Sequence, residues 1–351
     1  MSQVRFRQAI SRLPAYVAGK GEAGKVVKLS SNELPFAPAP QIIQAGEEAL
    51  ATVNRYPNAI GSALVEKLAA HFGLEENQVV VGPGSIQVLA NALTVVAQAG
   101  NNVIYPWRSF EAYPILVGIT GASSRQIPLN NQGSHDLPAI LEAVDADTAA
   151  VILCSPNNPT GPSLSALQVR QFLEDLPQTV LTVLDEAYFE FDTSPGHVDG
   201  AALLADFPNL LVLRTFSKAY GLAGLRCGYG LTSPQVAAAI GKVATPFGLS
   251  GVAEACALAA LAAEEIMRQQ VAKICQERER VVGKLRENGW SIPQAGGNFI
   301  WFAGQVGAEI QAVALSQGIQ TRGFPEGVRV TIGNRTENDQ FLAAISGINP
   351  R

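Results

Sequence analysis

The amino-acid sequence predicts an α/β fold: a large domain with a mostly parallel sheet covered by helices on both faces, and a smaller C-terminal α+β domain. Three observations lead to this prediction. Short apolar runs recur along the first two-thirds of the chain, helix-like patterns alternate with them, and the pattern changes after about residue 245. Strands that alternate with helices are typical of a parallel sheet, because each parallel connection needs a crossover.

The predicted strands of the large domain are apolar runs of strand length that end at turn residues. Most of them are continuously apolar, as strands buried on both faces must be. They are QVVVG (78–82), NVIYP (102–106), AAVILCSP (149–156), TVLTVLDEAY (179–188), NLLVLRTFSK (209–218) and RCGYGL (226–231). Ligand sites in such sheets lie at the carboxyl ends of the strands, so polar residues that follow these runs are the candidates for function.

The predicted helices of the large domain lie between these runs. Their apolar spacing indicates helices over 61–71, 85–98, 164–175 and 234–243. The first residues, which carry Pro, Gly and Lys and little periodicity, are expected to form an arm. The predicted division of the chain is an N-terminal arm (1–36), a large domain (37–245) and a small C-terminal domain (246–351).

The C-terminal domain begins with a long helical pattern. Residues 250–289 contain no proline and predict one long helix, interrupted at most once, that stops at Gly289. Two short strands, NFIWF (298–302) and VRVTIG (328–333), follow. A last helix is expected to start at Thr336, with acidic residues in its first turn. Helices beside a small sheet predict an α+β domain.

Composition limits the functions that this chain can have. It has 351 residues, 47% hydrophobic and 16% charged, with a net charge of −5. An acidic chain is unsuited to binding nucleic acid or an anionic membrane surface, and no apolar run approaches the roughly 18 residues of a membrane span. Four cysteines without a C-x-x-C pair predict free buried thiols in a reducing compartment, and so a cytoplasmic protein. Three scattered histidines make a metal site improbable.

A glycine-containing turn follows the first of the apolar strands. Gly84 and Ser85 belong to the string GPGSIQ, which leads into a predicted helix. The first N–H groups of a helix have no intrahelical acceptor, so such a turn can bind a phosphate. A tight strand-to-helix turn without a ligand explains this string equally well.

Two asparagines follow a second apolar strand, in the string SPNNPTG (155–161). The side-chain amide of Asn158, at the carboxyl end of a strand, can donate a hydrogen bond to a phenolate-like oxygen of a ligand. Taken alone, the string is explained more simply as a turn before the helix expected over 164–175.

A carboxylate follows a third apolar strand, in the string LDEAY. Asp185 would be partly buried there, which is unfavourable unless a cation or a hydrogen-bond donor pairs with it. A protonated ring nitrogen of a ligand is one such partner, and Tyr188 could direct its hydroxyl at the same ligand. The alternative is an aspartate that caps a following turn.

An amine follows a fourth apolar strand, in the string TFSKAYGLAGLR. Lys218 is the only lysine within positions 68–241. In a dry pocket desolvation lowers the pKa of a lysine, and its neutral amine can form a Schiff base with an aldehyde. Thr215, Ser217 and Arg226 offer two hydroxyls and a guanidinium, a set suited to a phosphate. The alternative is a surface lysine paired with a carboxylate.

Taken together, the four strings predict a single ligand site. They supply a phosphate turn, an amide, a carboxylate and an amine, each at the end of a predicted strand. Pyridoxal phosphate requires a phosphate-binding cup, a partner for its phenolic O3′, an anion beside its ring nitrogen and a lysine for its aldehyde. The combination predicts pyridoxal 5'-phosphate as the cofactor, and no metal.

The same strings resemble the fold-type I pyridoxal-phosphate aminotransferases, and among them the histidinol-phosphate aminotransferase-like group. The resemblance covers nearly the whole chain and is carried by LSSNELPFAP, NRYPN, VVGPGS, SPNNPTG, LDEAYFEF, TFSKAYGLAGLRCGY, GNFIWF and VRVTIGNRTEN. It implies an aspartate-aminotransferase-like fold, transamination of small amino acids and 2-oxo acids, and a homodimer with shared active sites.

The resemblance also implies a role for each matching residue. Lys218, Asp185 and Tyr188 are the implied catalytic residues: Lys218 binds the cofactor aldehyde and moves a proton, and Asp185 pairs with the ring nitrogen. The implied cofactor contacts are Gly84, Ser85, Ile86, Thr215, Ser217 and Arg226 around the phosphate, Asn158 and Tyr188 at O3′, Phe110 on the ring, and Tyr56 from the neighbouring subunit. The implied substrate contacts are Arg329 at the α-carboxylate, with Asn32, Asn298 and Arg322.

Departures from the pattern of the histidinol-phosphate enzymes bear on the substrate. Leu34 and Ala37 replace an Asn and a Gly that are usual in those enzymes. The string WRSFEAYP (107–114), with VNRYP and KVATPF, resembles the actinobacterial branch of aromatic-amino-acid (phenylalanine) aminotransferases. The expected reaction moves an amino group between Phe, Tyr or Trp and 2-oxoglutarate.

Two alternatives stay open at this point. Arg322 occupies a position that could serve a phosphate, so the chain could be a histidinol-phosphate aminotransferase of histidine synthesis. A less favoured alternative is a cofactor-binding regulator that keeps the fold and catalyses nothing.

Overall fold

The computed structural model describes residues 4–11, 13 and 26–350. Its centre is a seven-stranded sheet in the order β2-β8-β7-β6-β5-β3-β4. The bounds of these strands are β2 Val79–Gly82, β3 Asn102–Trp107, β4 Ser123–Pro128, β5 Thr148–Cys154, β6 Leu181–Asp185, β7 Leu210–Thr215 and β8 Gly228–Thr232. Only β8 runs antiparallel to its neighbours. The predicted mostly parallel sheet is therefore confirmed.

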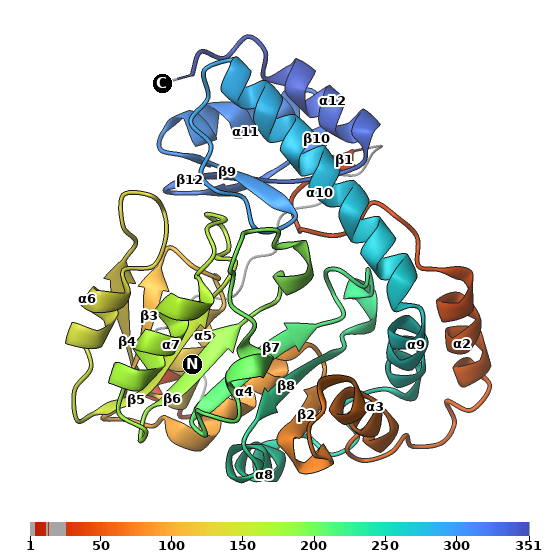
Figure 1. Ribbon diagram of the computed structural model, residues 1–351, viewed down its shortest axis with the longest axis vertical. Coiled ribbons are helices and arrows are strands. Elements are labelled where there is room, and N and C mark those ends of the chain that lie inside the picture. The colour runs from red at the N-terminus through yellow and green to blue at the C-terminus, as the bar shows by residue number, and fades with distance from the viewer. Residues whose placement is uncertain (1–3, 12, 14–25, 351) are drawn as a thin grey trace.

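Helices cover both faces of this sheet (Figure 1). Apolar side chains of α4 (Ser85–Val96), α5 (Tyr113–Thr120) and α8 (Pro234–Val243) pack on one face. The other face is packed by α3 Ser62–Phe72, α6 Leu137–Glu142, α7 Ala166–Asp175 and α9 Gly251–Ala262. The strands are continuously apolar for this reason: in β5, Ile152 belongs to the first core and Leu153 to the second.

A three-stranded antiparallel sheet in the order β11-β12-β9 forms a second layer. Its strands are β9 Phe299–Ala303, β11 Arg322–Phe324 and β12 Gly327–Thr331, and a short parallel pair joins β1 Val27–Lys28 to β10 Ile319–Gln320. The accompanying helices are α10 Glu264–Glu287, α11 Val306–Ser316 and α12 Arg335–Ala344. Two further helices are α1 Gln8–Ser11 and α2 Pro40–Leu50.

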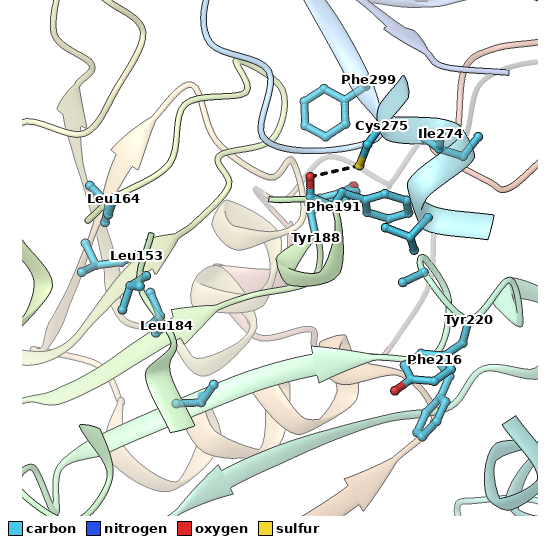
Figure 2. Packing of buried hydrophobic residues seen from close by; sticks show 14 of the residues in the cluster. Leu153, Leu164, Leu184, Tyr188, Phe191, Phe216, Tyr220, Ile274, Cys275 and Phe299 are labelled. Atoms are coloured by element: carbon cyan, nitrogen blue, oxygen red, sulfur yellow. Dashed lines mark hydrogen bonds between the residues drawn. The ribbon is translucent and has the colours of Figure 1, made fainter. Parts of the chain in front are cut away.

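The long helix α10 connects the two sheets. Figure 1 shows it running from α9, beside the large sheet, up to the small sheet. Its buried side chains meet the segment that follows β6, where the thiol of Cys275 lies 3.5 Å from the carbonyl oxygen of Phe191 (Figure 2). Tyr188 packs edge-on against Phe299 of β9, with ring centroids 5.0 Å apart. One continuous core therefore extends from the large sheet to the small one.

Several predictions about elements need correction. Strand β4 was not expected, because its sequence SSRQIP is polar; the structure places it at an exposed edge of the sheet, where no apolar run is required. The helical stretch predicted over 250–289, with at most one interruption, is confirmed as two helices that meet at Ala263. Helix α12 begins at Arg335 rather than Thr336, because Asn334 caps it and exchanges hydrogen bonds with Glu337. Gly289 does follow α10, with φ at 85°.

Other expectations concern the chain as a whole. All four cysteines are free and buried, as predicted, while the compartment stays a prediction. Part of the predicted arm, namely 1–3, 12 and 14–25, lies outside the described residues, and the proposed boundaries at 36 and 245 stay predictions. Within the described residues, no helix is long and apolar enough to cross a membrane and no cluster of metal-ligating side chains occurs.

Candidate active site

A pocket of about 450 Å³ lies at the carboxyl ends of the strands of the large sheet, beneath the small sheet. This volume lies in the usual range of small-molecule sites. Twelve predicted residues line it: Ser85, Ile86, Phe110, Asn158, Asp185, Tyr188, Thr215, Ser217, Lys218, Arg226, Arg322 and Arg329. The rule that function gathers at strand ends holds here because β2, β5, β6 and β7 run in the same direction.

Asp185, the last residue of β6, is a buried carboxylate at the floor of the pocket. The hydroxyl of Tyr113 donates to its Oδ2 at 2.8 Å, and the backbone N–H of Ala187 donates to its Oδ1 at 3.2 Å. Burial raises the pKa of Asp185, against the lowering effect of these donors and of Lys218. A cation bound next to this carboxylate would relieve its desolvation, so the site suits a protonated ring nitrogen.

Lys218 follows the end of β7 and carries its amine into the same pocket. Its Nζ donates to the backbone oxygens of Ser31 at 2.9 Å and Asn32 at 3.3 Å. Burial, together with the positive charges of Arg329 and Arg226, lowers the pKa of Lys218 to about 7. A large share of the amine is therefore neutral near neutral pH, as a nucleophile toward an aldehyde must be.

A cradle for a phosphate lies at the start of α4. Gly84 precedes the helix with φ at 81°, and a Cβ there would lie 2.6 Å from the guanidinium of Arg226. A Cβ on Gly228 would lie 2.2 Å from the backbone nitrogen of Ser85. The guanidinium of Arg226 also donates to the Ser217 hydroxyl at 3.1 Å. Glycine is needed at both places because the helix terminus and the guanidinium approach so closely.

Asn32 ties the N-terminal segment to both sheets. Its side chain is fully buried; its amide nitrogen donates to the Tyr188 hydroxyl at 2.9 Å, and its Oδ1 accepts from the Thr331 hydroxyl at 2.9 Å. The amide nitrogen of Asn298 donates to the backbone oxygen of Asn32 at 3.2 Å. Asn32 and Asn298 are both fully buried and are not among the residues that line the pocket, so their predicted contact with a substrate stays a prediction. Burial raises the pKa of Tyr188 to about 12.

Arg329 of β12 reaches down from the small sheet. Its guanidinium donates to the Oδ1 of Asn158 at 2.5 Å and to the backbone oxygen of Ser30 at 2.6 Å. Because Asn158 accepts with its oxygen, its amide nitrogen is the group that can donate to a ligand in the pocket. Arg329 is 7% exposed, a position in which a guanidinium can bind a carboxylate from the substrate.

A second arginine lies beside Arg329 and already holds a carboxylate. Arg322 of β11 is the cross-strand partner of Arg329, and both line the pocket. The guanidinium of Arg322 donates to both carboxylate oxygens of Glu111 at 2.9 Å. A similar pair joins the same two segments outside the pocket lining, where Arg108 donates to both carboxylate oxygens of Glu326 at 2.9 and 2.8 Å.

Two predicted cofactor contacts, Phe110 and Tyr56, lie in different places. Phe110 lines the pocket and packs edge-on against Tyr113, with ring centroids 5.6 Å apart. Tyr56 lies away from this pocket: its side chain is 84% exposed and its ring centroid is 4.8 Å from that of Phe247. Exposure is expected of a residue whose predicted contact is with another subunit, and that role stays a prediction.

The residues present fit pyridoxal phosphate. A buried carboxylate with a raised pKa, an amine with a lowered pKa and a glycine cradle beside a guanidinium converge on one pocket. These are three of the four features that this cofactor requires of its protein, and Asn158, in the same pocket, offers the fourth, a partner for O3′.

Two functional side chains escaped the sequence analysis. Tyr113 and Glu111 both belong to the string WRSFEAYP, which was interpreted for substrate preference and, at Phe110, for a contact with the cofactor ring. The sequence signal for both was a polar side chain shortly after a predicted strand. That signal was insufficient, because the partners of Tyr113 and Glu111 lie 72 and 211 residues further along the chain.

Comparison with known proteins gives consistent results. Residues 24–345 match the family "Aminotransferase class I and II". Proteins named aromatic amino acid aminotransferase are 43% identical in Cutibacterium acnes, over 99% of both chains, and 44% identical in Thermobifida fusca, over 96% of this chain and 95% of the other. The crystal structure of histidinol-phosphate aminotransferase from Sinorhizobium meliloti, in complex with pyridoxal-5'-phosphate, superposes with a TM-score of 0.89 at 29% identity, covering 98% of this chain and 97% of the other.

Proposed function

Because this chain belongs to the class I and II aminotransferases and is a pyridoxal-phosphate-dependent transaminase, we propose that aromatic amino acids are its amino donors and 2-oxoglutarate its acceptor. The observation that carries the proposal is the name shared by full-length relatives at 39–44% identity. Membership of this family counts against the alternative of a catalytically silent regulator.

The proposed roles follow from the contacts in the pocket. When bound, pyridoxal phosphate supplies an aldehyde that takes up the amino group and a ring that accepts electrons. Lys218 would attach the cofactor and then move a proton at the substrate Cα, since its amine has a lowered pKa. Asp185, held by Tyr113 and Ala187, would keep the ring nitrogen protonated.

The other residues would bind and orient. Arg226, Ser217 and the N-terminus of α4 would hold the phosphate through charge-assisted hydrogen bonds. Asn158 and Tyr188 would contact the phenolic oxygen, and Arg329 would bind the substrate α-carboxylate. The small sheet would close over the substrate and exclude water, because Arg329 reaches the pocket from β12.

An apolar wall of the pocket would be shared between the cofactor and the side chain of an aromatic substrate. Ile86, Leu89 and Phe110 line the pocket from the start of α4 and the segment after β3. A phenyl ring buried against such side chains gains roughly 25 cal/mol per Å² of apolar area removed from water. The pocket therefore supports a ring as well as an α-carboxylate.

Steady-state kinetics with phenylalanine and histidinol phosphate as alternative amino donors, each with 2-oxoglutarate, tests this proposal. We expect kcat/KM to be about tenfold or more higher for phenylalanine, since one unfavourable charge in a pocket is worth a comparable factor. A higher kcat/KM for histidinol phosphate would reverse the substrate assignment and leave the transaminase assignment in place.

Histidinol phosphate stays the second candidate because of one structural relative. The Sinorhizobium meliloti enzyme shares 29% identity and nearly the full length, and Arg322 supplies a guanidinium in the pocket where a phosphate could bind. The Arg322→Ala variant should then lose far more activity with histidinol phosphate than with phenylalanine.

We also propose a homodimer in which Tyr56 reaches the cofactor phosphate of the partner subunit. Tyr56 and Phe247 form an exposed aromatic pair, and Ile43, Val53 and Ile60 are exposed apolar side chains of the neighbouring α2 and α2–α3 segments. Sedimentation should give twice the chain mass of 37.0 kDa, and Tyr56→Phe should weaken cofactor binding about tenfold. A monomer with full activity would contradict the proposal.

A further inference from the structure

The pair between Glu111 and Arg322 is the one ion pair in the described part of the chain whose two members both line the pocket. Glu111 is 28% exposed and Arg322 16% exposed at their side chains, so solvent screens the pair only in part. Three hydrogen bonds of 2.9 to 3.2 Å join the two groups. The carboxylate therefore occupies the face of the guanidinium that an anionic ligand would use.

Arg322 and Arg329 differ in how they are held. Arg329 donates to the side-chain oxygen of Asn158 and to the backbone oxygen of Ser30. The charge of Arg322, by contrast, is balanced by Glu111. The two arginines are opposite each other in the register of β11 and β12, and an amino acid bound to Arg329 would extend its side chain toward this pair.

We propose that Glu111 is a specificity-determining residue that masks Arg322, so that a substrate side chain bearing a carboxylate or phosphate must displace Glu111 while an uncharged ring need not. The inference rests on the proposed function, because it assumes that a substrate with its α-carboxylate at Arg329 fills the pocket. It deepens that function by naming the residue that lets one pocket accept an aromatic side chain and an anionic side chain in turn.

The charges of the Glu111–Arg322 pair explain why the pocket favours an aromatic side chain over an anionic one. With Glu111 in place, an approaching ring meets a neutral pair, whereas a bare guanidinium would have to lose its hydration against an apolar group. An anionic side chain gains the same contact with Arg322 that Glu111 gives up, and it leaves a carboxylate without its partner. Anionic substrates are therefore disfavoured without being excluded, as the acceptor 2-oxoglutarate requires.

The chain contains a matched control for a purely structural role. Glu326 pairs with Arg108 in the same bidentate manner and joins the same two segments, yet neither residue lines the pocket. If these ion pairs serve only to hold the small sheet against the large one, Glu326→Gln and Glu111→Gln should have the same effect on all substrates.

The test compares Glu111→Gln, Glu326→Gln and the double variant Glu111→Gln/Arg322→Gln as holoenzymes. In a ping-pong reaction kcat/KM for each substrate reports its own half of the reaction, so phenylalanine, 2-oxoglutarate and histidinol phosphate are varied separately. For Glu111→Gln we expect kcat/KM to rise about tenfold for both anionic substrates, through KM, and to fall about threefold for phenylalanine. The double variant should lose the gain for anions, and Glu326→Gln should change neither ratio.

Two dead-end inhibitors measure the same selectivity by binding alone. Glutarate and 3-phenylpropionate each offer one carboxylate to Arg329, and they differ in the carboxylate or ring at the other end. Glu111→Gln should lower the ratio of the glutarate to the 3-phenylpropionate inhibition constant about tenfold or more. A ratio that moves no more than in Glu326→Gln would overturn the masking role. If the wild type fails to transaminate phenylalanine while Glu111→Gln still lowers the ratio of inhibition constants, the proposed donor is refuted and the role of Glu111 is retained.

Discussion

Replacement of Lys218 by alanine is expected to lower kcat by about a thousandfold or more, because a proton at the substrate Cα would lose its acceptor and donor. The amine lies in the pocket with Asp185 and Arg226, and burial lowers its pKa to about 7. Turnover of phenylalanine with 2-oxoglutarate measures the loss. Borohydride treatment followed by mass spectrometry should show the cofactor fixed to the wild type and absent from the variant.

Two control variants separate this role from the general effect of removing a lysine. Lys242→Ala removes an exposed lysine in the last turn of α8 and should leave kcat unchanged. Lys218→Arg keeps a positive charge but has no nucleophilic amine, so it should be as inactive as Lys218→Ala. An active Lys218→Arg enzyme would show that only the charge matters.

Replacement of Asp185 by asparagine is expected to lower kcat by about a hundred- to a thousandfold while it stabilises the cofactor-free protein. Asparagine keeps both hydrogen bonds: its oxygen can accept from Ala187, and its nitrogen can donate to the Tyr113 hydroxyl. The pKa of Asp185 is raised in the folded state, so at neutral pH its ionised form opposes folding, and this unfavourable contribution diminishes as the pH falls. Asparagine removes this unfavourable contribution because its side chain carries no charge.

Activity and stability must therefore change in opposite directions. Thermal unfolding of the cofactor-free variant should show a higher Tm than the wild type at pH 7, and the difference should shrink as the pH falls toward 4. A variant that loses stability and activity together would assign Asp185 a structural role only. Glu326→Gln, at a distant ion pair, should show no such opposition.

Most of the large sheet was predictable because its strands are buried on both faces. Continuous apolar runs such as the one ending at Asp185 can be recognised without any knowledge of their neighbours. Strand β4 was missed for the converse reason, since an exposed edge strand needs no apolar pattern. Helix α2 was missed although its apolar positions follow a helical spacing, and α6 was missed because its six residues carry little periodicity.

The candidate site was predictable to the extent that its residues follow strands. Lys218, Asp185, Asn158 and Ser85 each come just after an apolar run, and parallel strands bring such residues to one edge. Asn32 and Asn298 were assigned to the substrate because their segments adjoin the pocket. That assignment stays a prediction, and the buried contacts that these two residues make depend on how the small sheet is seated.

The order of residues along the chain is sufficient to identify the cofactor and the family and to propose the attaching lysine, because each of these depends on a residue type at a strand end. The contacts that tune the site needed the folded chain. Tyr113 meets Asp185, Glu111 covers Arg322 and Asn32 joins both sheets through side chains 72 to 299 residues apart. Such pairs form when the order of strands and the seating of one sheet on another bring distant segments together, and no local pattern in the sequence encodes that distance.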